Sequence, residues 1–96
     1  MAYIHIAASR GATIDDFRAT AAKHNPPQDI DGLLAWAVGT DANGLHVVTV
    51  WESQAHAERW QAEQLFPAFQ SLGVMSNVMD NTDFVTYDTD EFFLRS

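Results

Sequence analysis

Two histidines, His5 and His46, stand in apolar runs and are the side chains best suited to acid–base chemistry. A histidine in a half-buried pocket takes a proton near neutral pH, so either one could act as a general base. Either could equally be a hydrogen-bonded structural histidine. Neither has a second histidine at a ligand spacing or a framing carboxylate cluster, so we expect no metal site. His24 and His56 are expected at helix positions that face water.

Aromatic side chains could shape a site for a flat ligand. Trp36, Trp51 and Trp60 could wall such a ligand, and an indole N–H could donate to a developing oxyanion. The core or a subunit interface is the favoured interpretation for Trp36 and Trp51. Tyr3 shares a strand face with His5 by alternation, and it could be a donor near the pocket or an interface residue.

Composition excludes several classes of protein. The 96 residues carry five basic and thirteen acidic side chains, and a net charge of −8 disfavours nucleic acid and anionic membranes as partners. The chain has no cysteine, which removes thiolate chemistry and Cys-ligated zinc. It also has no Gly-rich phosphate loop and no apolar run long enough for a membrane span. We therefore expect one cytoplasmic domain over residues 1–96, with no cofactor.

Hydrophobic patterns and turn signals divide the chain into strands and capped helices. Thr13 with Asp16 forms a capping-box pattern, Ser53 can cap a second helix, and Gly73 is the expected end of that helix after a break at Pro67. The expected strands cover residues 2–8, 33–40, 45–52 and 83–87, and the middle two flank a hairpin turn at 41–44. The acidic tail, residues 88–96, carries three large apolar side chains and should dock on something.

The order β-α-β-β-α-β predicts an α+β, ferredoxin-like sheet with helices on one face. In this arrangement we expect the first and third strands to be central and parallel. Both alternating sets of side chains on these strands contain apolar residues, so the face without helices also needs a cover. Two copies packed sheet to sheet would provide it. We therefore predict a homodimer, a dimeric α+β barrel.

Several segments resemble the antibiotic biosynthesis monooxygenase group of the dimeric α+β barrel superfamily. The resemblance covers about residues 3 to 72 and rests on a turn glycine before a capped helix, a strand that ends in Trp-Glu-Ser, and aromatics on the following helix: Gly11, Phe17, 50–53, Trp60 and 66–69. It implies two ferredoxin-like sheets closing a barrel at a dimer interface, with a ligand pocket between sheet and helices in each protomer.

The same resemblance implies roles for particular positions. Trp60 is similar to a ring-contacting tryptophan of the haem-degrading branch, which also has a histidine at the position of Gln70 and an asparagine at that of Ile4. With Gln70 and Ile4 in those places, haem degradation is not expected. Trp60 remains a candidate pocket residue because the family places one there.

These features favour a cofactor-independent monooxygenase acting on an aromatic, phenolic or polyketide-like substrate. In such an enzyme His46 or His5 would accept a proton, while Trp60 and Tyr3 would orient the ring or stabilise reduced oxygen. His46 is the preferred base, because its alternation with Val48 and Val50 could turn it toward the helices. A non-catalytic binding or accessory protein and a polyketide cyclase remain alternatives, since all three need the same aromatic-lined cavity.

Overall fold

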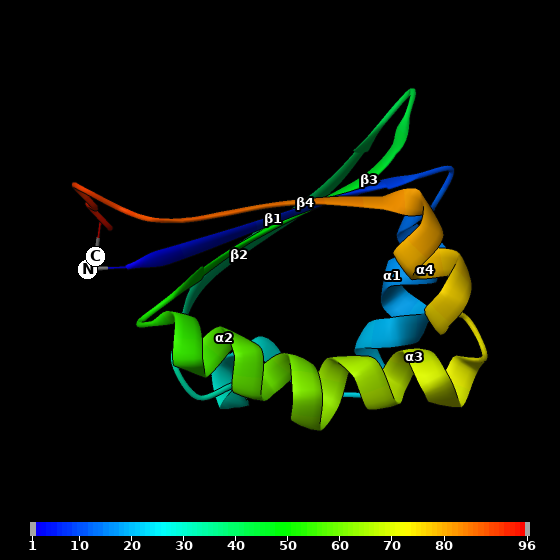
Figure 1. Ribbon diagram of the computed structural model, residues 1–96, viewed down its shortest axis with the longest axis horizontal. Coiled ribbons are helices and arrows are strands. Elements are labelled where there is room, and N and C mark those ends of the chain that lie inside the picture. Colours follow the sequence, from blue (N-terminus) through cyan, green and yellow to red (C-terminus); the bar gives the residue numbers. More distant parts are fainter. Residues whose placement is uncertain (1, 96) are drawn as a thin grey trace.

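The computed structural model describes residues 2–95, in which four strands form one sheet beneath which the helices pack (Figure 1). The strand order is β2-β3-β1-β4. The strands are β1 (Tyr3–Arg10), β2 (Leu33–Asp41), β3 (Gly44–Trp51) and β4 (Thr82–Asp88). All helices lie on one face of this sheet, as the ferredoxin-like prediction requires. The predicted fold class is confirmed.

The directions of the central strands differ from the prediction. Strands β1 and β3 are central, but they pair antiparallel, with His5 opposite Thr49 and Ile6 opposite Val48. The expectation of parallel neighbours is wrong because the hairpin after β2 inserts β3 between β1 and β2. Since β3 is antiparallel to both, β1 and β2 run parallel without touching.

Local capping explains where the helices begin and end. In α1 (Ile14–Ala21), Thr13 Oγ1 accepts the Asp16 N–H at 3.1 Å, and Asp16 Oδ2 accepts the Thr13 N–H at 2.8 Å. This is the capping box expected from the sequence. Ser53 caps α2 (Gln54–Trp60) by accepting the His56 N–H. Gly73, with φ of 71°, ends α3 (Phe66–Leu72) in the left-handed conformation that favours glycine.

A π-helical segment, η2 (Gln61–Leu65), joins α2 to α3, so the chain continues as one long helical stretch rather than breaking at Pro67 (Figure 1). Pro67 has no N–H to donate within the ladder. The turn before it widens instead, and the Phe66 N–H reaches back to the Gln61 carbonyl. Such wide turns often occur where a helix borders a functional site.

Two further short helices were not expected from the sequence. A 3-10 turn, η1 (Pro27–Asp29), lies in the loop before β2, and α4 (Met75–Asn81) leads into β4. Beyond β4, Phe92, Phe93 and Leu94 are exposed, with Phe93 at 79%. Their docking partner therefore stays a prediction.

The core gathers at one end of the helix-facing side of the sheet. Tyr3, Ile30, Trp51 and Ala57 form its buried cluster, and Trp51 is only 1% exposed. No helix within residues 2–95 is long and apolar enough to span a membrane. Toward the other end of this side, the sheet and helices separate and leave a cavity.

Candidate functional site

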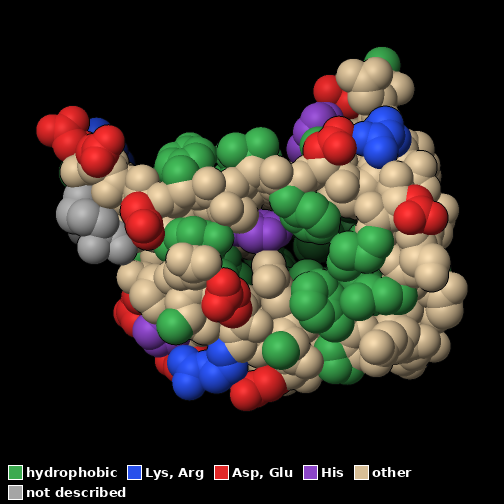
Figure 2. All heavy atoms as spheres, in the orientation of Figure 1, with side chains coloured by type: hydrophobic (Ala, Val, Ile, Leu, Met, Phe, Trp, Pro, Cys, Tyr) green, Lys and Arg blue, Asp and Glu red, His purple; other side chains and the backbone are tan. Residues whose placement is uncertain are grey.

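A cavity of about 710 Å³ lies between the sheet and the helices. Figure 2 shows a hollow between the two layers, with hydrophobic side chains around it and a histidine beside it. Every helix from α1 to α4 and all four strands contribute to the walls, β2 through Trp36 alone. A cavity of this size is in the range that holds a small organic ligand.

Most of the wall is apolar and aromatic. The large apolar side chains that line the cavity are Phe17, Trp36, Leu45, Val47, Trp60, Leu65, Phe66, Phe69, Leu72, Val74, Val78, Met79 and Phe84. Polar side chains also line it, and some of them pair with one another: Ser9 Oγ lies 2.7 Å from Thr82 Oγ1, and Asn81 Nδ2 donates to Asn77 Oδ1 at 3.0 Å. This composition favours a flat, largely uncharged ligand over a phosphate or a sugar.

His5 projects from β1 into the cavity. Its ring packs against Phe84 at a centroid distance of 5.4 Å, and burial lowers the pKa of His5 below its ordinary value of 6.5. The lowered pKa keeps the imidazole neutral at pH 7, which is the form that accepts a proton. The structure thus places an uncharged imidazole on the cavity wall.

Trp60 lines the same cavity from the end of α2. Its ring lies 5.4 Å from that of Trp51 and 5.2 Å from that of His24. Its Nε1 is buried and has no hydrogen-bond partner within residues 2–95. A buried indole N–H without an acceptor is costly, so this donor suits a ligand oxygen.

Trp51 packs against Trp60 but differs from it in that its indole N–H has a hydrogen-bond partner. Its Nε1 donates to Thr49 Oγ1 at 2.8 Å, and the same hydroxyl donates to the His5 carbonyl at 3.4 Å. Trp51 is therefore a core residue, as favoured from the sequence. Trp36, for which the same interpretation was favoured, packs against the core cluster and also lines the cavity.

Tyr3 shares the helix-facing side of β1 with His5, as alternation predicts, but it does not reach the cavity. It is 7% exposed and belongs to the buried cluster around Trp51. The expectation that Tyr3 is a pocket donor or an interface residue is wrong, because α2 and the segment around Ile30 close over this end of the sheet.

His46 faces away from the cavity. It pairs with Ala8 on β1, while the next pair, Ala7 and Val47, supplies side chains to the cavity wall. Alternation therefore puts His46 on the face without helices, and the expectation that it turns toward them is wrong. Its Nε2 lies 2.9 Å from Asp41 Oδ2 across the hairpin. The pKa of the Asp41 carboxyl lies below its usual value. The main cause is the hydrogen bond that Asp41 accepts from the Asn43 N–H, and the hydrogen bond with the His46 ring is the next.

His24 was expected to face water, yet it lines the cavity. Its ring packs edge-on against Trp60 and, at 6.4 Å, against Trp36. A signal for this position is present in the sequence. Phe17, Thr20 and His24 follow one another at spacings of three and four residues, and all three line the cavity.

His56 was also expected in water, but its side chain is only 26% exposed. Its Nδ1 lies 2.7 Å from Ser53 Oγ, and its Nε2 lies 3.6 Å from Glu52 Oε2. The ring covers Gly32, where a Cβ atom would come within 2.3 Å of it. This cluster fixes the turn before β2 and lies outside the cavity. No group of three potential metal ligands occurs within residues 2–95.

Comparison with known proteins supports the fold. No protein-family profile matches the sequence, and no curated protein matches it. Among solved structures, a "putative antibiotic biosynthesis monooxygenase" from Deinococcus radiodurans matches with a TM-score of 0.64 at 17% identity, over 100% of this chain and 99% of that one. The chain shares its fold. A protein of unknown function from Nitrosomonas europaea also has a TM-score of 0.64, at 13% identity over 99% of this chain and 94% of its own.

These matches confirm the resemblance expected from the sequence at the level of the fold. Identities of this size carry no residue roles. Chemistry depends on the particular residues of a site, and in this chain those are the residues that line the cavity.

Proposed function

We propose that this protein is a cofactor-independent monooxygenase that oxidises a phenolic, anthrone-like aromatic substrate in the cavity between sheet and helices. The observation that carries this proposal is His5, a desolvated histidine whose lowered pKa keeps it neutral inside an aromatic-walled cavity. The printed name of the Deinococcus radiodurans neighbour is in keeping with it.

The reaction balances without an external reductant. His5 takes a proton from the CH₂ carbon of the substrate, and the resulting carbanion gives one electron to O₂. Recombination forms the C–O bond of a peroxide, which takes the proton back from His5. Loss of the second C–H proton and cleavage of the O–O bond then give a ketone and water. The substrate supplies all four electrons, and one oxygen atom remains in the product.

Trp60 supplies the second element of this chemistry. Its unpartnered Nε1–H is a buried donor that strengthens as negative charge develops on an oxygen of the bound substrate or of the peroxide. The apolar wall excludes water, which makes this hydrogen bond stronger and protects the carbanion. His5 and Trp60 thus take the roles of base and oxyanion donor.

We also propose that the protein is a homodimer. The face of the sheet without helices carries the partly exposed Ile4, Ile6 and Val48, and the edge strand adds Val85, which is 54% exposed. Such a row of β-branched side chains favours burial against a second, identical sheet. The dimer would cover this face and leave the cavity to the ligand.

Oxygen consumption with an anthrone tests the catalytic proposal, with His46 as the matched control. We expect His5→Ala to lower turnover about 100-fold or more, the scale of a lost general base, and His46→Ala to change it less than about threefold. Turnover of the parent protein should rise with pH through the lowered pKa of His5 and be flat at neutral pH.

Binding of a redox-stable anthraquinone, followed by tryptophan fluorescence, separates catalysis from simple binding. If the parent protein binds the quinone but consumes no oxygen above the buffer rate, it is a binding protein and the monooxygenase proposal fails. Equal loss of turnover in both histidine variants would also contradict the role given to His5.

A further inference from the structure

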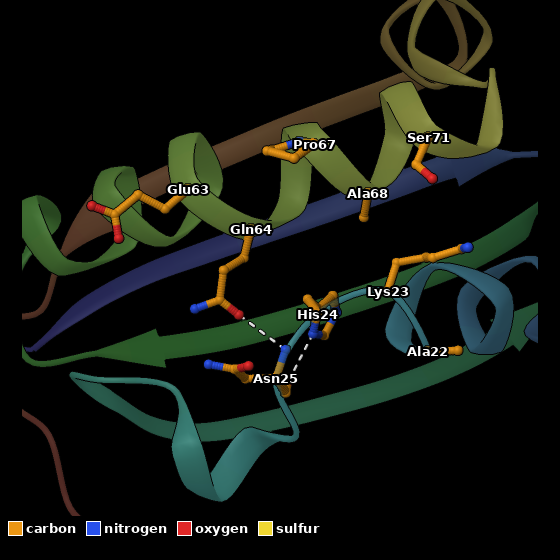
Figure 3. A pocket seen from close by; sticks show the side chains of 9 residues that line it. All are labelled: Ala22, Lys23, His24, Asn25, Glu63, Gln64, Pro67, Ala68 and Ser71. Carbon is orange, nitrogen blue, oxygen red and sulfur yellow. Dashed lines mark hydrogen bonds between the residues drawn. The ribbon is translucent and has the colours of Figure 1, made fainter.

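His24 stands between two hollows of the molecule. It lines the main cavity, and it also lines a smaller, open pocket of about 360 Å³ on the outer surface. Figure 3 shows this outer pocket, with His24 and Asn25 on one side and Gln64 reaching toward them from the helical layer. The imidazole is thus part of the partition between cavity and surface.

Hydrogen bonding fixes the tautomer of His24. Its Nδ1 lies 2.8 Å from the Asn25 carbonyl, and since a carbonyl only accepts, Nδ1 must carry the proton. In the neutral ring Nε2 is then the acceptor. The Asn25 backbone is held in turn, because its N–H donates to Gln64 Oε1 at 2.9 Å (Figure 3). His24 is therefore a positioned acceptor rather than a free surface side chain.

The sheet register separates His24 from His5. His5 and Trp36 both lie opposite Thr49, on the two strands that flank β3. Two interstrand spacings place their backbones roughly 10 Å apart. His24 packs on Trp36 and Trp60, at the β2 side of the cavity, while His5 packs on Phe84 at the β4 side. The two imidazoles therefore approach the cavity from opposite sides.

Charged groups near this wall already have partners or lie outside it. Arg10 pairs with Asp83 at 2.6 Å, and the Asp16 carboxylate accepts the Thr13 N–H in the capping box. Lys23 and Glu63 line the outer pocket beside His24, and neither lines the cavity. Arg10 and Asp16 line the cavity, but the rings packed on His24 itself are those of Trp36 and Trp60, and beside them a ligand hydroxyl is a suitable donor.

We propose that His24 is a second ligand-binding group of the cavity, whose Nε2 accepts a hydrogen bond from a hydroxyl at the end of the ligand away from His5. This inference rests on the proposed aromatic ligand and adds a specificity to it. The cavity then favours flat aromatic substrates that carry a hydroxyl at the end away from His5. In a quinone probe, which has no CH₂ group, a hydroxyl at the opposite end takes the place of that group beside His5.

Three redox-stable probes test this inference by tryptophan fluorescence titration at pH 7. They are 2,6-dihydroxyanthraquinone, with hydroxyls at opposite ends, 2-hydroxyanthraquinone with one hydroxyl, and anthraquinone with none. We expect the diol to bind about tenfold more tightly than the mono-hydroxy compound, which is the scale of one hydrogen bond.

Two substitutions of His24 provide matched variants. In His24→Asn the amide nitrogen can replace Nδ1 toward the Asn25 carbonyl, but no group replaces Nε2. In His24→Gln the amide oxygen can replace Nε2. We expect His24→Asn to abolish the preference for the diol and His24→Gln to keep most of it. Near-ultraviolet circular dichroism checks that both variants keep the parent fold.

The ring itself gives an independent readout. In ¹⁵N-edited spectra of the free parent protein, His24 should show the Nδ1–H tautomer, and the diol should shift Nε2 more than the mono-hydroxy probe does. Equal affinities for diol and mono-hydroxy probe in the parent, or an unchanged preference in His24→Asn, overturns the inference while leaving the proposed oxidation intact. If none of the three probes binds, the aromatic cavity ligand fails, and this inference fails with it.

Discussion

The two faces of the sheet are built from the same strands but differ in what covers them. On the helix-facing side, Tyr3, His5 and Ala7 follow one another from a closed core into an open cavity. On the other side, Ile4 and Ile6 form part of a continuous apolar surface without helices. One face encloses a cavity, whereas the other is an apolar surface that no helix covers.

The two histidines on the central strands, His5 and His46, differ in environment in the same way. His5 is desolvated in the cavity, and its pKa is lowered by burial. His46 lies on the other face, half-exposed, with a carboxylate at 2.9 Å. The same side chain is thus desolvated in a cavity on one face and half-exposed beside a carboxylate on the other. Since successive side chains of a strand point to opposite faces, moving either histidine by one position along its strand would put it on the other face.

The largest expected effect follows from a charge on the face without helices. Val48→Glu would place one carboxylate from each protomer in the proposed sheet-to-sheet interface, and an uncompensated buried charge costs about 3–5 kcal/mol. We expect the parent to sediment at twice the chain mass of 10.7 kDa at micromolar concentration and Val48→Glu to sediment as a monomer.

The control for this experiment is Ala55→Glu, which adds the same charge at an exposed position of α2 and should leave the dimer intact. A parent protein that stays monomeric and well folded at tens of micromolar would contradict the dimer. In that case the apolar face would be a solvent-exposed surface rather than an interface.

Much of the fold could be predicted because its signals are local. The capping box at Thr13, the cap at Ser53 and the left-handed Gly73 each depend on a few neighbouring residues, and each occurs as expected. Strand direction was harder to predict, because it depends on contacts between distant segments. Here β3 inserts between β1 and β2 and runs antiparallel to both. The short helix α4 was missed since it follows the expected stop at Gly73 directly.

The site was less predictable because strand alternation gives two faces without saying which one the helices cover. For this reason the sequence favoured His46 over His5 as the residue that faces the helices. The sheet register instead puts His5 on the cavity side and His46 on the other face. His24 was missed because its role depends on packing against Trp36 and Trp60, from elements distant in sequence. Trp60 could be chosen from a family resemblance, but its unpartnered N–H is visible only in three dimensions.

Removing one tryptophan from the core and one from the cavity wall would sharpen the contrast between core and cavity. Trp51→Ala should cost about 3–5 kcal/mol of unfolding free energy, because this ring is 1% exposed and fills the core. Trp36→Ala borders the cavity and should cost about 1–2 kcal/mol. Urea unfolding at a fixed chain concentration measures both. Equal losses would show that the cavity wall is as tightly packed as the core.

The smallest expected effect is a difference in the pH dependence of stability between the two faces. Because burial lowers the pKa of His5, the unfolded chain binds more protons than the folded chain between the folded pKa and 6.5. The free energy of unfolding should therefore be highest above pH 6.5 and fall as the pH drops through this window, and His5→Gln should remove that fall.

Asp41 also has a lowered pKa. Because it is an acid, its contribution to the free energy of unfolding is present above pH 3.8 and is lost as the pH falls through its folded pKa. Asp41→Asn should thus change only the acid limb of the curve. Thermal unfolding of the parent and both variants from pH 3 to 8 separates the windows, and a fall near pH 6 that persists in His5→Gln would refute the assignment of that limb to the cavity.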